Sequence, residues 1–208
     1  MFNKTQFKED FLELFKKRND AVEYGFTQDL IGPAMQGINN TSNSVDLYVL
    51  SSSVGTVHIH TDDLHSVFSP EDFLLFLKLL DRSAIDISSN YSIVVGTNGE
   101  GYMLTYEGTK ADFEKMGNPL KHGGNSFWNI NEDDLSDIGD YNDYLDDGME
   151  QAEIFMNSIN TEFLKDGLTL ESLGFKLTEL KFNNNGKLVS SKEVSLNKNK
   201  KVKKSKCK

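Results

Sequence analysis

Three of the four histidines in the chain fall between residues 58 and 65. His58 and His60 end an apolar run, Val54 to His60, that predicts a β-strand. Successive side chains of a strand point to opposite faces, so the imidazoles of a His-x-His pair share one face and can bind the same metal ion. The chemistry that this pair predicts is metal coordination, with a third ligand from elsewhere in the chain.

Asp72 is the candidate for that third ligand. The segment Ser69-Pro70-Glu71-Asp72 predicts the start of a helix, with Ser69 as N-cap and an acid three residues later. A helix that begins here can return Asp72 to the end of the strand. Two histidines and one carboxylate leave a position for water, which is typical of catalytic zinc sites. Helix capping alone is the alternative explanation of Asp72.

A hydrolytic zinc site also needs a carboxylate that carries protons. Glu23 lies in the segment Val22-Glu23-Tyr24-Gly25-Phe26, just before a long Gly- and Asn-rich stretch. We expect Glu23 to take this role. The alternative is a glutamate that flanks a strand and faces solvent.

The spacing of these residues resembles the zinc signature of the JAB/MPN (JAMM) metallopeptidase superfamily. His58-x-His60 is followed, after eight residues, by Ser69-x-x-Asp72. The likeness is greatest to the JAB-like domains of bacterial Rhs-type polymorphic toxin proteins, where a similar segment reads Leu-Leu-Ser-Ile-Phe-Ser-Pro-x-Asp. Leu64 to Asp72 stands in the same frame, and the resemblance covers about residues 20 to 190.

The resemblance implies a zinc-dependent peptidase or isopeptidase that hydrolyses an amide bond in a protein or peptide substrate. In that interpretation zinc is bound by His58, His60 and Asp72. Ser69 hydrogen-bonds the oxyanion or the metal-bound water, and Glu23 is the general base.

Two departures from the family pattern keep alternatives open. Thr61 stands where the family has proline, and the spacing from His60 to Asp72 is one residue longer than usual. Glu71 falls at the usual distance and is a rival third ligand. Further possible ligands are Asp62, Asp63 and His65.

Two other functions compete with the enzyme. One is a catalytically weak or inactive JAB-like binding module. The other is an acidic immunity or inhibitor protein, in which residues 132–153 cover a basic toxin. That segment contains ten carboxylates and no Lys or Arg.

The hydrophobic periodicity predicts an α+β or mixed α/β fold. The resemblance implies a single JAB/MPN-like domain with a central mixed sheet flanked by helices. Helices are expected over residues 5–18, 69–80, 109–116 and 149–165, with a loop over 32–44. Strands are expected over 45–50 and 54–60, and in two hairpins, 91–95 with 102–106 and 175–182 with 188–196.

The charge distribution suggests how the 208 residues are divided. Residues 198–208 contain seven lysines and few apolar side chains. We therefore expect a domain over 1–196, with an acidic loop at 132–153, followed by a basic disordered tail over 197–208. The net charge of −10 argues against nucleic acid bound by the acidic body.

Composition excludes several other classes of protein. The longest apolar run, residues 73–80, is interrupted by Lys78 and is too short to span a membrane. The N-terminal residues lack the apolar region of a secretory signal, so we expect a cytoplasmic protein, or an effector exported without a conventional signal peptide. The lone Cys207 excludes an internal disulfide and a cysteine-based zinc ribbon.

Overall fold

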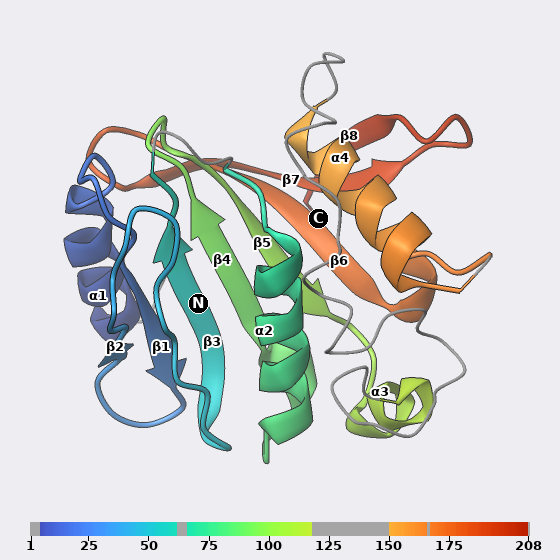
Figure 1. The fold of residues 1–208 in the computed structure, drawn as a ribbon, viewed down its shortest axis with the longest axis horizontal. Helices are drawn as coiled ribbons and strands as arrows, with labels where there is room; N and C mark the ends of the chain where they lie inside the picture. The colour runs from blue at the N-terminus through green and yellow to red at the C-terminus, as the bar shows by residue number, and fades with distance from the viewer. Residues whose placement is uncertain (1–4, 62–65, 118–149, 166, 208) are drawn as a thin grey trace.

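A single eight-stranded sheet forms the centre of the molecule (Figure 1). The computed structural model describes residues 5–61, 66–117, 150–165 and 167–207. The strand order is β2-β1-β3-β4-β5-β6-β7-β8, and every neighbouring pair is antiparallel except the parallel pair β3 and β4. The strands are β1 (Gly25–Asp29), β2 (Met35–Gln36), β3 (Ser53–Ile59), β4 (Tyr91–Val95), β5 (Glu100–Tyr106), β6 (Phe175–Phe182), β7 (Leu188–Leu196) and β8 (Val202–Lys206). The predicted mixed α/β class with one mixed sheet is confirmed.

Helices pack on both faces of this sheet. They are α1 (Thr5–Lys16), α2 (Pro70–Arg82), α3 (Lys110–Met116) and α4 (Gln151–Ser158), which continues as a π-helix (Ile159–Phe163). Single 3-10 turns occupy Ile87–Ser89 and Glu171–Leu173. Phenylalanines of α1 form one core with the sheet, whereas α2, α3 and α4 contribute to a second core. Figure 1 shows α1 and α2 on opposite sides of the strands.

The central strand β4 explains why there are two cores. Ile93 and Val95 belong to the α1 core, while Val94 between them belongs to the α2 core. Side chains alternate along a strand, so a strand that is covered on both faces is a continuous apolar run rather than an alternating one. The segment Tyr91–Val95 is buried at every position.

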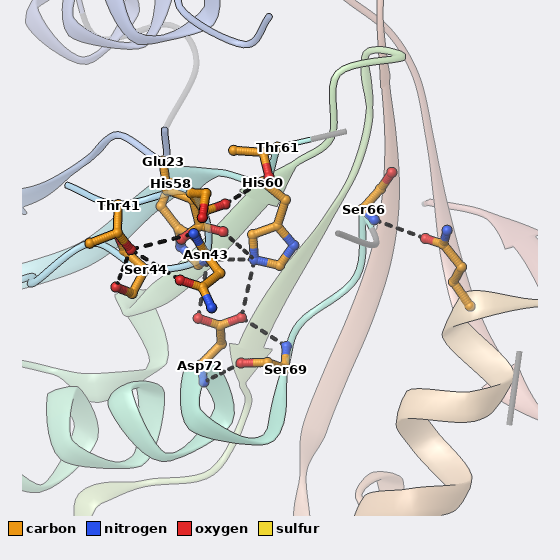
Figure 2. Close-up of polar contacts among 12 residues, drawn as sticks. Glu23, Thr41, Asn43, Ser44, His58, His60, Thr61, Ser66, Ser69 and Asp72 are labelled. Carbon is orange, nitrogen blue, oxygen red and sulfur yellow. Dashed lines mark hydrogen bonds and ion pairs between the residues drawn. The ribbon is translucent and has the colours of Figure 1, made fainter. Parts of the chain in front are cut away.

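The parallel pair β3 and β4 determines where α2 lies. Parallel neighbouring strands need a crossover connection, and α2 provides it. Phe73, Phe76 and Leu77 of α2 are buried in the core on this face. The helix predicted from Ser69 onward is confirmed, and its first turn lies near the carboxyl end of β3 (Figure 2).

Four other predicted features are confirmed with small shifts. These are the helix near the N-terminus, the short helix capped by Thr109, the hairpin β4–β5 and the hairpin β6–β7. The helix expected over 149–165 is shorter, because α4 ends at Ser158 and a π-helix follows.

The strand expected over residues 45–50 is wrong. Asp46 forms only an isolated bridge with Ile38. Side chains satisfy the backbone beyond that point: Arg82 donates to the Val49 carbonyl at 3.0 Å, and the Leu50 N–H donates to Ser53 Oγ at 2.9 Å. On this side of the sheet β3 is instead flanked by β1, and β1 by β2, which lies within the loop expected over 32–44; the sequence interpretation identified neither strand.

The disordered tail expected over residues 197–208 is also wrong, and so is the domain boundary at 196. Val202–Lys206 forms β8, which pairs with β7. The high lysine content predicted disorder because it leaves little apolar surface to bury. Backbone pairing with β7 and ion pairs with carboxylates hold the segment in place instead. Lys201 pairs with Glu153, and Lys204 pairs with Glu150 and Glu179.

Most of the expected acidic loop, residues 132–149, lies outside the described residues. Its last members lie at the start of the helix expected from residue 149: Glu150 is the N-cap of α4 and Glu153 lies in the first turn. Among the helices of the described ranges, none is long and apolar enough to cross a membrane.

Candidate metal centre

The two histidines lie together at the carboxyl end of β3, an inner strand of the sheet. His58 pairs with Val94 of β4, and His60 extends the pairing by donating its backbone N–H to the Val95 carbonyl at 3.0 Å. Both side chains therefore lie on the face that α2 covers, as the His-x-His spacing predicts. Their Nε2 atoms are 3.0 Å apart, and the two residues are only 2% and 5% exposed.

Asp72 reaches the same point from the first turn of α2. One oxygen, Oδ1, lies 3.1 Å from His58 Nε2, and the other, Oδ2, lies 3.5 Å from His60 Nε2 (Figure 2). Asp72 also completes a capping box with Ser69: the Ser69 N–H donates to Oδ2 at 2.8 Å, and the Asp72 N–H donates to Ser69 Oγ at 3.2 Å. Asp72 therefore caps its helix and faces the histidines at the same time.

The three side chains have the donor set of a metal site. One ligand atom from each of His58, His60 and Asp72 lies within 4.8 Å of the others, so the group could hold a metal ion. Two imidazole nitrogens and a carboxylate oxygen are ligands that zinc accepts in tetrahedral sites. The convergence of both Nε2 atoms on a single carboxylate fits a shared cation, because a cation can accept lone pairs from all three groups at once.

Glu23 lies beside this group because β1 pairs with β3. Gly25 is opposite His58, and the Ile59 N–H donates to the Tyr24 carbonyl at 2.9 Å. A Cβ atom on Gly25 would lie 2.8 Å from His58 Cβ, so only glycine allows the two strands to approach at this position. Glu23 Oε1 is 3.9 Å from His60 Nε2.

Burial of Glu23 has the largest effect on the pKa of its carboxyl group. The residue is 3% exposed, and Oε1 makes no hydrogen bond to any described residue. Burial raises the pKa of Glu23 to about 7, partly opposed by His60 and reinforced by the negative charge of Asp72. A carboxyl group in this range exchanges protons near neutral pH.

The pKa of the neighbouring Asp72 carboxyl group is shifted in the opposite direction. Burial acts to raise its pKa, but the adjacent His58 and His60 outweigh burial through their charge and hydrogen bonds. The pKa of Asp72 is therefore held well below its usual range. The site thus contains one carboxylate that stays ionised and one that can carry a proton.

A polar loop over residues 39–44 lines the site beside Glu23, and the sequence interpretation had left it without a role. The Glu23 N–H donates to the Thr41 carbonyl at 2.6 Å, and Thr61 Oγ1 donates to the Ser42 carbonyl at 2.8 Å. Figure 2 shows Thr41, Asn43 and Ser44 next to Glu23 and His58. The clustering of Asn, Ser and Thr in this segment was the available signal, but only the hydrogen bonds with Glu23, just before β1, and Thr61, just after β3, place it here.

The other ligand candidates differ in their positions. Glu71 precedes Asp72 on α2 but has an exposed side chain and is not part of the His–His–Asp group. Asp62, Asp63 and His65 lie outside the described residues. Ser69 lies at the start of α2, where its hydroxyl oxygen already accepts the Asp72 N–H.

Comparison with protein-family models, with curated protein sequences and with solved structures finds no match to this chain. The inference about its function therefore depends on the geometry of the site and on the motif.

Proposed function

We propose that this protein is a zinc-dependent hydrolase of amide bonds in proteins or peptides, of the JAB/MPN type. The observation that carries the proposal is the convergence of His58, His60 and Asp72 with the buried carboxyl group of Glu23 beside them. The order of these residues along the chain, and Ser69 at the N-cap, also agree with the JAB/MPN signature.

His58, His60 and Asp72 would hold the ion. When bound, zinc lowers the pKa of a coordinated water molecule and polarises a carbonyl group. Asp72 suits the role of ligand because its carboxylate stays ionised. The capping box fixes the orientation of that carboxylate, since the Ser69 N–H holds Oδ2 at 2.8 Å.

Glu23 would act as the general base and then as the general acid. Its raised pKa lets it accept a proton from the attacking water and pass it to the amine nitrogen that leaves. The loop over residues 39–44 keeps Glu23 in position through the hydrogen bond from the Glu23 N–H to the Thr41 carbonyl.

Ser69 would stabilise the oxygen of the substrate carbonyl. Its Oγ accepts the Asp72 N–H at 3.2 Å, which leaves the hydroxyl proton to donate. A donor that is fixed in this way favours the negative charge that develops on the oxygen during hydrolysis.

The deciding experiment measures zinc and cleavage in the same preparations. The protein is purified without chelator, and its metal content is determined by elemental analysis. The same samples are incubated with a proteome-derived peptide mixture, in which mass spectrometry detects new termini. We expect about one zinc per chain and zinc-dependent cleavage.

Two variants separate the role of the ligands from that of the base. His60→Ala should lose both zinc and cleavage, whereas Glu23→Gln should keep zinc and lose cleavage. Glu114→Gln, an exposed position on α3, is the matched control and should keep both. A protein that binds zinc yet cleaves neither peptides nor a lysine-linked isopeptide would be a binding module instead of an enzyme.

A further inference from the structure

A lysine-rich hairpin, residues 197–206, lies at the end of the sheet away from β2. Two of its lysines are used within the fold: Lys201 pairs with Glu153 at 2.7 Å, and Lys204 pairs with Glu150 at 2.7 Å. The other lysines are exposed and have no ion-pair partner among the described residues; they are Lys198, Lys200, Lys203 and Lys206. The hairpin therefore presents four positive charges that no carboxylate of the described residues pairs, on a protein whose net charge is −10.

The turn of this hairpin contains a lysine in a strained conformation. The β6–β7 and β7–β8 turns have the same hydrogen bonds: the side chains of Asn183 and Asn197 each accept two backbone N–H groups within their turns. The residue at the left-handed position is Gly186 in the first turn, with φ +72°, and Lys200 in the second, with φ +59°. Glycine is the favoured residue at that position, although Gly186 is also packed against Leu12.

Lysine is an unusual residue at this left-handed position. A residue that is held in a sparsely populated backbone region costs stability and is typical of functional positions. Lys200 is exposed at the tip; its backbone N–H donates to the Asn197 carbonyl at 2.9 Å, and its own carbonyl accepts from Asn157 at 3.1 Å. The strained residue thus contributes a positive charge to the tip of the hairpin, and its side chain makes no hydrogen bond or ion pair with the described residues.

Contacts with α4 hold the hairpin in place. Glu153 is 4% exposed, and its two oxygens accept from Lys201 Nζ at 2.7 Å and from the Val202 N–H at 3.1 Å. Asn157 donates to the Lys200 carbonyl, as described above. The free lysines are therefore presented by an anchored strand and turn, which reduces the conformational entropy that a partner would have to overcome.

The outer side of β8 has the geometry to accept another strand. Within the described part of the chain β8 is the last strand of the sheet. Glu153 takes the N–H of its first residue, Val202, and beyond that residue the outward N–H and C=O groups of β8 have no strand partner there. Lysines on an edge strand normally repel other strands. An incoming strand that contains carboxylates would be attracted instead of repelled, because opposite charges on neighbouring strands attract. Lys203 and Lys206 lie on opposite faces of β8, so such a strand would meet positive charge on both faces.

We propose that β8 and the lysine turn are a docking site for an extended acidic segment of a partner protein, which adds to the sheet beside β8. Backbone hydrogen bonds would supply affinity, and Lys198, Lys200 and Lys203 would select for carboxylates. Residues 197–206 contain no arginine and no aromatic residue, which nucleic-acid-binding surfaces use for phosphate forks and base stacking. A flat membrane is disfavoured, because lysines on both faces of a strand do not share one plane.

A direct test uses a fluorescein-labelled peptide, Thr-Thr-Glu-Glu-Glu-Glu-Thr-Thr, and fluorescence anisotropy with the full chain. We expect binding that weakens as salt rises from 50 to 500 mM, since exposed charges are screened. The variant Lys198→Gln/Lys200→Gln/Lys203→Gln should bind about tenfold more weakly, because three exposed ion pairs are lost. The control Lys8→Gln/Lys16→Gln/Lys115→Gln changes the net charge equally at exposed positions and should bind normally.

Two further arms test the strand and the strained turn. The same peptide with N-methyl groups on alternate residues keeps its charge but loses backbone donors, and it should bind at least tenfold more weakly. Lys200→Gly should raise the melting temperature by about 2–4 °C through release of strain, while it weakens peptide binding. A stabilised Lys200→Gly protein with unchanged binding would show that the lysine has no role in docking.

Other results would overturn the proposal. Equal binding of the N-methylated peptide would show that charge alone acts, without strand addition. Tighter binding of a single-stranded DNA 20-mer or of phosphatidylserine vesicles at the same salt would assign the surface to a nucleic acid or a membrane. Salt-sensitive self-association in sedimentation, removed by the triple variant, would assign it to a second copy of the chain.

Discussion

Two helices of this protein begin with the same arrangement of hydrogen bonds. At the start of α2, Ser69 and Asp72 bond each other's backbone N–H groups, and at the start of α3, Thr109 and Asp112 do the same. The remaining contacts of the two aspartates differ. Asp72 Oδ1 lies 3.1 Å from His58 Nε2, whereas Asp112 Oδ1 accepts from Lys115 one turn along its own helix.

The surroundings of the two aspartates explain the difference. The side chain of Asp72 is 15% exposed and that of Asp112 is 51% exposed. Hydrogen bonds from Thr109 and Lys115 lower the pKa of Asp112 to about 2, so this carboxylate is stabilised within its own helix. The pKa of Asp72 is lowered by histidines from a different strand. A capping box thus becomes part of a candidate metal centre only where tertiary packing places it beside other ligands.

The largest expected effect is a difference in zinc content between variants of the two capping boxes. Asp72→Asn keeps hydrogen-bond acceptors for the cap but weakens the ligand, so zinc content should fall from about one per chain to near zero. Asp112→Asn makes the same change in the other box and should leave zinc content unchanged. Elemental analysis after dialysis against trace zinc measures both. Equal zinc in the two variants would mean that Asp72 serves only as a cap.

A second expected effect is a pH dependence of stability that comes from the buried carboxyl group of Glu23, near Asp72. In the metal-free protein the pKa of Glu23 is raised to about 7, above its ordinary value of 4.5, so ionisation of Glu23 opposes folding. Stability should therefore fall as the pH rises from about 4.5 to 7 and then level off. Glu23→Gln removes this dependence and should be more stable than the natural sequence at pH 8, with little difference at pH 4.5.

The measurement is urea unfolding in EDTA at several pH values. Glu114→Gln on α3 is exposed and should follow the natural sequence at every pH. A Glu23→Gln protein that is no more stable at pH 8 than at pH 4.5, relative to the natural sequence, would contradict the raised pKa.

The smallest expected effect is shared by the two boxes. Ser69→Ala and Thr109→Ala each remove an N-cap acceptor, and each should cost about 1 kcal/mol of unfolding free energy. Chemical denaturation of metal-free protein measures both. Only Ser69→Ala should also weaken zinc affinity, through a less constrained Asp72 carboxylate. A similar loss of affinity in Thr109→Ala would indicate a general effect of stability.

Local patterns predicted the parts of the site that lie within single elements. The alternation of His58 and His60 and the cap at Ser69 are properties of one strand and one helix start, so periodicity and capping rules were sufficient. Glu23 was proposed only from its position before a loop and from the resemblance, because the strand that positions it, β1, is short and has Gly25 and Gln28 in a run without clear alternation. The polar loop over residues 39–44 depends on pairing between distant segments, which no local pattern reports.

The wrong predictions have the same origin. Residues 45–50 have the composition of a strand, yet Arg82 from α2 takes the Val49 carbonyl, and side-chain bonds replace a ladder. Residues 202–206 have the composition of a disordered end, yet Glu153 from α4 and the edge of β7 hold them. In both cases a contact from a remote element outweighed the local tendency.

The parallel pairing of β3 with β4 has a consequence for the order of folding events. The connection that contains α2 must cross over before β3 and β4 can pair, which brings distant residues together and costs more loop entropy than the closing of a hairpin such as β4–β5. His58 and His60 meet Asp72 only when α2, the helix of this crossover, has packed against β3. A cation that binds only to the completed unit would therefore act mainly on the rate at which the chain unfolds, and would leave the rate of folding almost unchanged.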